Sequence, residues 1–308
     1  MAGGPQGACH CQRRADGACG VNLRGKTVVL TGASSGIGAQ AAVRLRAQGA
    51  LVHLVGRDER RTRQVAEALD APWYTADFEE LADVHRLADE LMRATHHIDV
   101  LAANAGAVMP DRHTADGIDA TFQVNVLSPW LLMLLLADHL RGGRILATNS
   151  RAHKNAVIGL HSLEDLARGR QGVSGHRAYA RSKLAAGILL REYGRRHRGI
   201  DVGDFHPGII ASGFGRSLGK RGAVTKVLAR PFTDTPDQGA ARLVHLASRT
   251  GPLAGTYYTR TRPAKASPQL PSRQLGAALW DFATDLTSSR RPAPGSASST
   301  GRHSSTGR

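Results

Sequence analysis

The chain has 308 residues, and 41% of them are hydrophobic, so it is long and apolar enough to bury a substantial core. Its formal net charge is +16, and part of this charge comes from basic residues at the two ends of the chain. Elsewhere the arginines are interspersed with acidic residues, as on a solvated surface. No specific nucleic-acid partner is therefore expected. The most apolar run, residues 126–137, is shorter than the roughly 20 residues of a membrane-spanning helix, which predicts no transmembrane segment and a soluble, cytoplasmic protein.

The first 21 residues contain all three cysteines, Cys9, Cys11 and Cys19, and lack the apolar core of a secretory signal. Cys9-His10-Cys11 with Cys19 could bind zinc, but this spacing matches no common zinc-finger pattern. We therefore predict a disordered extension over 1–21 and no metal site. Because no cysteine follows Cys19, disulfides do not hold the rest of the chain together.

From residue 22 onward, short apolar runs alternate with amphipathic stretches. The apolar runs predict buried strands at 27–31, 51–55, 73–76, 100–103, 144–148, 202–205 and 256–259. Helical periodicity follows them at 36–48, 58–69, 79–93, 117–140, 175–195, 235–247 and 274–286. This alternation predicts an α/β fold: a Rossmann-type, doubly wound, about seven-stranded parallel sheet with helices on both faces. We expect one domain over 22–287, and a disordered Ser/Gly/Arg-rich tail over 288–308.

A glycine-rich turn follows the first predicted strand and opens the first helix. It reads Thr31-Gly32-Ala33-Ser34-Ser35-Gly36-Ile37-Gly38. Glycines there let the backbone turn sharply and approach a pyrophosphate, which then faces free N–H groups at the helix N-terminus. With this spacing the chain resembles the short-chain dehydrogenase/reductase family, whose fingerprint is TGxxxGxG. The predicted cofactor-binding residues of the turn are Gly32, Ser34, Ser35, Gly36, Ile37 and Gly38.

The second predicted strand ends at Gly56-Arg57, where an enzyme that uses NAD usually has Asp or Glu. A carboxylate would bind the ribose 2′-OH and repel a 2′-phosphate, whereas Arg57, with help from Arg61, would attract the phosphate. Many family members that use NADP add a base in the glycine-rich loop, where this chain has serines, so these arginines must carry the discrimination. The sequence therefore predicts NADP(H) in preference to NAD(H).

Tyr179 and Lys183 stand one turn apart on the predicted helix 175–195, and so lie on the same face. The pKa of a phenol is near 10, and a neighbouring ammonium would lower it, which suits Tyr179 to general acid/base catalysis. Ser150 lies at the carboxyl end of the fifth predicted strand, where active sites of open α/β sheets collect. Its hydroxyl can donate a hydrogen bond to a substrate oxygen as negative charge develops.

Further motifs match the family in order. They are Asp77 and Phe78 after the third strand, Asn104, Ala105 and Gly106 after the fourth, and Pro207, Gly208, Ile210 and Ser212 after the sixth. The resemblance implies that all of these residues bind the cofactor, Asp77 at the adenine and Ser212 at the nicotinamide carboxamide. It also implies that Tyr179 and Lys183 contact the cofactor, Lys183 at the nicotinamide ribose.

Asn125 matches the asparagine that completes the family's catalytic tetrad by holding a water between the lysine and solvent. Pro129 has no N–H, so it leaves the Asn125 carbonyl free to accept such a bond, or it simply kinks the helix. Asn149 replaces the family's second serine and is assigned no role. Three histidines near the motifs are interpreted as structural or solvent-facing: His153, His176 and His206.

Residues 98–106, 124–132, 178–185 and 206–210 resemble the retinol-dehydrogenase-like branch. This implies an oxidoreductase that moves a hydride between NADP(H) and a lipophilic aldehyde, ketone or alcohol. A homodimer or a homotetramer is compatible with the sequence, which leaves the oligomeric state open. The resemblance leaves the physiological substrate and the direction of reaction open. The alternative is a non-catalytic NADP(H)-sensing protein on the same fold, but such proteins usually lose the tyrosine or the lysine, and both are present here.

Overall fold

The computed structural model describes residues 23–169, 175–210 and 234–288. The predicted extension over 1–21, its three cysteines, Ser212 and the tail from residue 289 lie outside these ranges.

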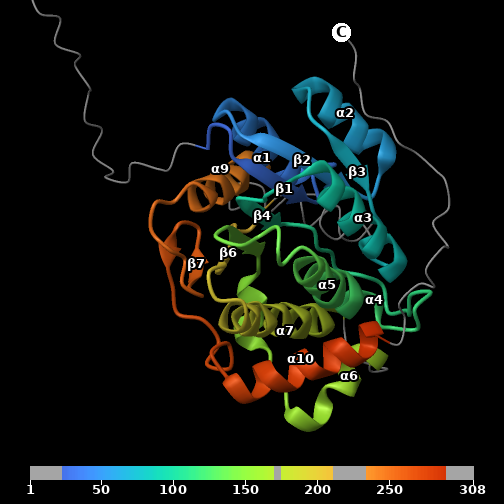
Figure 1. Ribbon diagram of the computed structural model, residues 1–308. Helices are drawn as coiled ribbons and strands as arrows, with labels where there is room; N and C mark the ends of the chain where they lie inside the picture. Colours follow the sequence, from blue (N-terminus) through green and yellow to red (C-terminus); the bar gives the residue numbers. More distant parts are fainter. Residues whose placement is uncertain (1–22, 170–174, 211–233, 289–308) are drawn as a thin grey trace, which may run out of the picture.

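Eight strands form one sheet in the order β3-β2-β1-β4-β5-β6-β7-β8 (Figure 1). Their bounds are β1 Thr27–Thr31, β2 Leu51–Gly56, β3 Trp73–Thr75, β4 Val100–Ala103, β5 Arg144–Thr148, β6 Asp201–His206, β7 Tyr257–Thr259 and β8 Arg262–Pro263. The first seven are parallel, which confirms the predicted doubly wound sheet. An eighth strand, β8, adds to the seven predicted ones and pairs antiparallel with β7. β8 has only two residues, both exposed, and one of them is a proline, which is typical of sheet edges. So short a strand has no recognisable pattern in the sequence.

Helices cover both faces of the sheet (Figure 1). One face carries α1 Gly36–Ala47, α2 Glu59–Leu69 and α9 Pro236–Ala247, and the other carries α3 Leu81–Ala94, α5 Ser128–Leu135 and α7 Gly175–Arg196. The closing helix, α10 Arg273–Ser288, packs on the outside of α7, and the short α6 Glu164–Arg168 lies near the start of α7. A separate hydrophobic core fills the space on each side of the sheet.

The single long helix predicted over 117–140 is wrong. The segment consists of α4 Ala120–Phe122, the π-helical turn η1 Gln123–Leu127 and α5 Ser128–Leu135. In η1 the Ser128 N–H donates to the Gln123 carbonyl, five residues earlier. Pro129 follows in the first turn of α5, where its missing N–H is tolerated. The hydrogen-bond ladder therefore shifts at Asn125, the residue that the family resemblance places in the active site.

The chain order reverses between β1 and β4. β1 pairs with β2 on one side and with β4 on the other. The loops that follow β1 and β4 therefore leave the sheet toward opposite faces, and the carboxyl ends of strands at such a reversal are where open α/β sheets bind ligands. The glycine-rich turn follows β1 and Asn104 follows β4, so both predicted motifs lie at this position.

Candidate active site

The turn between β1 and α1 needs its glycines for two different reasons. Gly32 and Gly36 have φ angles of +70° and +57°, in the left-handed region that favours glycine. A Cβ on Gly38 would collide with the carbonyl oxygen of Gly32. Ser35 is the N-cap of α1, and its side chain accepts no capping bond from the described first turn, so N–H groups remain for a ligand. This geometry fits the pyrophosphate of a dinucleotide.

The loops after β1 and β4 are joined to each other. The hydroxyl of Thr31 accepts hydrogen bonds from the N–H groups of Asn104 and Ala105, each at 3.0 Å. The Asn104 side chain donates to the Thr31 carbonyl at 3.1 Å and accepts from the Thr148 hydroxyl at 3.1 Å. The polar residues after three neighbouring strands are thus held in fixed positions around the reversal point.

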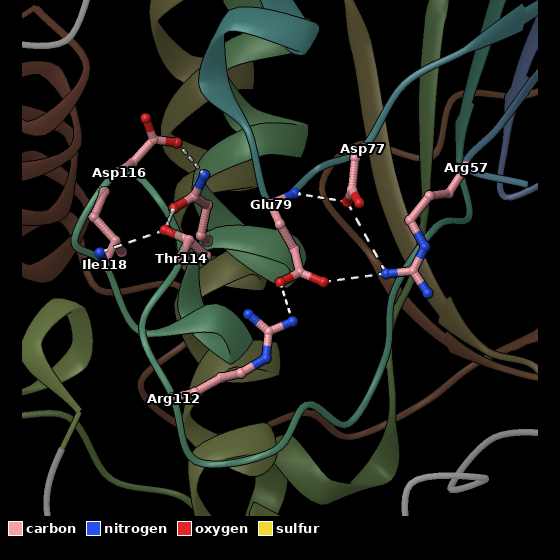
Figure 2. Close-up of polar contacts among 8 residues, drawn as sticks. Arg57, Asp77, Glu79, Arg112, Thr114, Asp116 and Ile118 are labelled. Atoms are coloured by element: carbon pink, nitrogen blue, oxygen red, sulfur yellow. Dashed lines mark hydrogen bonds and ion pairs between the residues drawn. The ribbon is translucent and has the colours of Figure 1, made fainter.

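Figure 2 shows the end of the site where Arg57 lies. The Arg57 guanidinium is 3.1 Å from one carboxylate oxygen of Glu79 and 4.0 Å from Asp77. The other oxygen of Glu79 binds Arg112, from the loop after β4. The Glu79 side chain is 11% exposed, whereas that of Arg57 is 63% exposed. Sequence reasoning missed Glu79 and Arg112, because these three residues come from three different loops.

The loop that carries Arg112 has a second anchor, also drawn in Figure 2. Asp116 accepts hydrogen bonds from the Gln123 side chain at 2.6 Å and from the Leu81 N–H at 2.9 Å. The Thr114 hydroxyl donates to the Gln123 side-chain oxygen at 2.5 Å. The loop is therefore tied both to the start of α3 and to η1.

The predicted catalytic side chains converge. Tyr179 and Lys183 are both buried on α7, and the Lys183 ammonium lies 5.8 Å from the centre of the Tyr179 ring. Lys183 donates a hydrogen bond to the Thr148 carbonyl at 3.0 Å. Ser150, two residues beyond β5, forms a hydrogen bond with Tyr179. A proton donor, a cation and a second hydroxyl therefore meet at the carboxyl end of the sheet.

Asn125 enters the same region from η1. Its side chain accepts a hydrogen bond from the Ala107 N–H at 3.0 Å and donates one to the Ala107 carbonyl at 2.7 Å. A Cβ on Gly106 would lie 2.9 Å from the Asn125 side-chain oxygen and 3.0 Å from the Lys183 nitrogen. Asn125 and Lys183 thus approach the same point of the backbone, and Gly106 leaves the space for both.

Burial shifts the pKa values of Tyr179 and Lys183. It raises the pKa of Tyr179 to about 12, and the hydrogen bond with Ser150 acts against this rise. Burial also lowers the pKa of Lys183 to about 8, and the negative charge of Asp204 acts in the opposite direction. Burial therefore determines the net direction of the Tyr179 shift, while Lys183 donates a hydrogen bond to the Thr148 carbonyl; the expected lowering of the Tyr179 pKa by Lys183 itself stays a prediction. At neutral pH Tyr179 holds its proton.

The segment after β6 forms the far end of the site. Gly208 has a φ of +107°, and a Cβ there would collide with the carboxylate of Asp234. The Asp234 N–H donates to the Ile209 carbonyl at 2.7 Å, and its carboxylate accepts from Arg242 at 2.6 Å. Arg242 also donates to the Pro207 carbonyl. This ion pair holds the predicted nicotinamide loop in place as far as Ile210, where the described residues stop.

The three nearby histidines have structural or surface positions, as expected. His153 is fully buried and His176 is exposed. The ring nitrogen Nε2 of His153 accepts the Ser267 N–H at 3.2 Å, so Nδ1 carries the hydrogen and donates to the Ser150 carbonyl at 2.5 Å. His206 is buried beside cations, and burial lowers its pKa to about 4, so it is neutral.

Asn149, to which the sequence assigns no role, holds the backbone of Ser150, the predicted catalytic serine. Its side-chain oxygen accepts the Ser150 N–H at 2.7 Å, and its amide nitrogen donates to Asp204. Asp204, fully buried on β6, also accepts a hydrogen bond from Arg191 at 2.9 Å. The acid inside the predicted buried strand 202–205 was the available signal, because a buried charge requires a partner.

Within the described ranges, no group of three or more His, Cys, Asp or Glu side chains is arranged to hold a metal ion. None of the described helices combines the length and hydrophobicity needed to cross a bilayer.

Comparison with known proteins identifies the family. The model of the short chain dehydrogenase family matches residues 26–162. A proposed daunorubicin C-13 ketoreductase of Streptomyces sp. strain C5 is 38% identical over an alignment of 272 residues, which covers 84% of this chain and 91% of that protein. Retinol dehydrogenase 12 of Homo sapiens is 30% identical over 292 residues, covering 88% of this chain and 90% of the relative.

Two solved structures have a similar fold. An uncharacterised protein from Mycobacterium paratuberculosis superposes with a TM-score of 0.70 at 28% identity, over 88% of this chain and 96% of that one. A short chain dehydrogenase from Burkholderia cenocepacia, in complex with NADP, gives a TM-score of 0.59 at 28% identity, over 77% and 97% of the two chains. The chain therefore belongs to the short-chain dehydrogenase/reductase family, in which it is retinol-dehydrogenase-like, and it is an oxidoreductase that acts on CH–OH or C=O groups with a nicotinamide cofactor.

Proposed function

We propose that this chain reduces a lipophilic ketone or aldehyde, and oxidises the corresponding alcohol in reverse, with NADP(H) in preference to NAD(H). The observation that carries the proposal is the meeting of Tyr179, Lys183 and Ser150 at the carboxyl end of the sheet. The glycine turn fits a dinucleotide, because the N-terminus of α1 follows it and its first N–H groups receive no side-chain cap from Ser35. The residues that would hold the cofactor are the glycines of this turn, Lys183 at the ribose, and the loop from Pro207 to Ile210.

Bound NADPH would supply the hydride, and residues of this chain would donate the proton and stabilise the charges that develop. Ser150 donates a hydrogen bond to the substrate oxygen and so stabilises the negative charge that develops there. Tyr179 donates its proton to the same oxygen. Lys183, an ammonium at neutral pH, stabilises the phenolate that remains. Because burial raises the pKa of Tyr179 to about 12, the proton is in place at neutral pH, which favours reduction.

The lipophilic substrate class rests on two observations. The relatives include proteins named as acting on daunorubicin and on retinol. In this chain, Ile209 and Val157 are 55% and 76% exposed, and each follows a segment of the active site closely in sequence. Ile209 belongs to the loop from Pro207 to Ile210 at the far end of the site, where an exposed apolar side chain suits an apolar ligand. We extend the relatives' substrate class to this chain on this basis; the expected cytoplasmic location and homodimer or homotetramer stay predictions.

The test of the function is NADPH consumption with ketones and aldehydes of graded size and polarity. We expect lipophilic ketones to exceed small polar ones in kcat/KM by at least about tenfold, because apolar burial contributes about 0.8 kcal/mol for each CH₂ group. NADPH binding without consumption in the presence of every carbonyl compound would favour the alternative, a non-catalytic NADP(H)-sensing protein.

The cofactor preference depends on Arg57. We expect NADPH to bind at least about tenfold more tightly than NADH, a difference of about 1.4 kcal/mol. Arg57→Asp should reverse this preference, because a carboxylate at this position repels the 2′-phosphate and accepts from the ribose hydroxyl. Arg63→Asp is the matched control, since it makes the same charge change on the exposed surface of α2. Equal affinities of the unaltered protein for the two cofactors, measured by fluorescence titration, would disprove the assignment.

A further inference from the structure

A buried ion pair lies beneath the catalytic serine. Asp204 is 0% exposed in the middle of β6, and its partner Arg191 on α7 is 9% exposed. Their side chains are 2.9 Å apart. Removing two charges from water is costly, and well-packed apolar residues often stabilise a fold as much or more. Stability alone is therefore a weak reason for this pair.

The first connection of the pair is to Ser150. The carboxylate of Asp204 accepts a hydrogen bond from the side-chain nitrogen of Asn149. The side-chain oxygen of Asn149 must therefore face the other way, toward the Ser150 N–H. On the opposite side, the His153 ring donates to the Ser150 carbonyl. The backbone of Ser150 is thus held at both its N–H and its carbonyl. The contact at the N–H depends on Asp204, because Asp204 determines which way the side-chain amide of Asn149 faces.

The second connection is to Lys183. Asp204, Asn149, Thr148 and Lys183 line one small interior cavity, whose other walls are mainly apolar: Val126, Trp130, Met133, Leu189 and Leu190 among them. In surroundings of low polarity a charge acts more strongly on its neighbours than it does in water. The negative charge of Asp204 accordingly raises the pKa of Lys183, against the effect of burial.

Other ionisable groups lie near the ion pair or, in the case of Tyr179, near Lys183. Tyr179 lies on α7, His153 on the 3₁₀ helix η2 Arg151–Asn155, and Tyr257 on β7. Burial raises the pKa of both tyrosines and lowers that of His153, so all three groups are neutral near pH 7. Among the described residues that line the cavity, Asp204 is the single carboxylate.

We propose that Asp204 is a positioning residue for the reaction: through Asn149 it fixes the backbone that carries the Ser150 hydroxyl, and it places a negative charge in the cavity that Lys183 also lines. This inference rests on the proposed function and gives it two further residues, Asp204 and Asn149. Neither is expected to touch the substrate, because both act through a neighbouring side chain.

One double variant tests the charge. Asp204→Asn alone would leave Arg191 buried without its counter-charge and destabilise the fold strongly, so it is combined with Arg191→Met. The double variant removes both charges and retains an amide oxygen for Asn149. We expect the upper limb of the pH profile for NADPH-dependent reduction to move at least about half a pH unit lower, because the ammonium loses its nearest negative charge. A profile that coincides with that of the unaltered protein would overturn the role of the charge.

A second variant tests the positioning of Ser150. Asn149→Ala leaves the ion pair in place, so we expect kcat to fall about tenfold or more while the upper limb of the profile stays where it was. In a Ser150→Ala background the same change should cost less than about threefold, because Asn149 acts through the serine. An equal loss in both backgrounds would overturn this part of the proposal. This comparison is decisive even where the charge variant does not fold.

Asp201→Asn is the matched control. Asp201 is the first residue of β6 and forms a similar ion pair, 2.8 Å from Arg144. Its loss should lower the melting temperature and leave the pH profile unchanged. Melting temperature and NADPH affinity verify that each variant folds. Turnover by the unaltered protein and its loss in Tyr179→Phe test the proposed function separately, whatever the Asp204 and Asn149 variants do.

Discussion

Replacing Tyr179 by Phe is expected to lower NADPH-dependent turnover by about 10²–10⁴-fold, the usual contribution of general acid/base catalysis. The change removes the hydroxyl and keeps the ring, which is 8% exposed and packed within the fold. Folding and NADPH affinity should therefore remain close to those of the unaltered protein. The measurements are kcat and KM on a verified substrate, the melting temperature, and a fluorescence titration with NADPH.

Tyr193→Phe provides the matched control for this substitution. Tyr193 is a second buried tyrosine on α7, and its hydroxyl donates to the Met133 carbonyl at 2.8 Å, away from the catalytic side chains. The same chemical change there should cost about 1 kcal/mol of stability and leave turnover unchanged. If Tyr179→Phe kept more than about a tenth of the activity, Tyr179 would not be the proton donor and the proposed mechanism would be wrong.

Lys183→Ala is expected to lower turnover by about 10²-fold and, unlike Tyr179→Phe, to weaken NADPH binding as well, because this lysine is proposed to hold the nicotinamide ribose. In the unaltered protein, kcat/KM for reduction should fall as the pH rises through about 8, the value to which burial lowers the pKa of Lys183. The direction follows from the charge, since the ammonium is present below this pH and lost above it. Tyr179 stays protonated through this range, so its titration does not cause the decline.

The lysine prediction has two checks. The decline above pH 8 should disappear in Lys183→Ala, whose residual activity no longer depends on an ammonium. Lys26→Ala, which breaks a surface ion pair with Asp99, should reproduce the profile of the unaltered protein. An unchanged NADPH affinity in Lys183→Ala would remove the lysine from the cofactor site, and an unchanged decline would assign the titration to another group.

Local patterns predicted most of the sheet and the catalytic pair. Apolar or aromatic runs marked most of the strands, although β6 includes Asp201, Asp204 and His206, and the turn at Gly32–Gly38 is specified by the backbone conformation that glycine permits. Tyr179 and Lys183 are four residues apart on one helix, so their shared face follows from helical geometry alone. The sequence could not predict the π-helical turn at Asn125, because a shift of one residue in the ladder leaves the apolar periodicity almost unchanged.

Contacts between distant segments depend on the tertiary structure. Asn149 and Asp204 meet because β5 pairs with β6 in a register that places Thr148 opposite Phe205, and Arg191 reaches them from α7. The pKa of Tyr179 also depends on packing, since burial raises it while Lys183 donates to a backbone carbonyl. The sequence by itself determined which residue types stand at the ends of the strands. The tertiary structure alone decided which of these residues are in contact and how far they are shielded from water, because strand register and burial depend on the whole packed sheet.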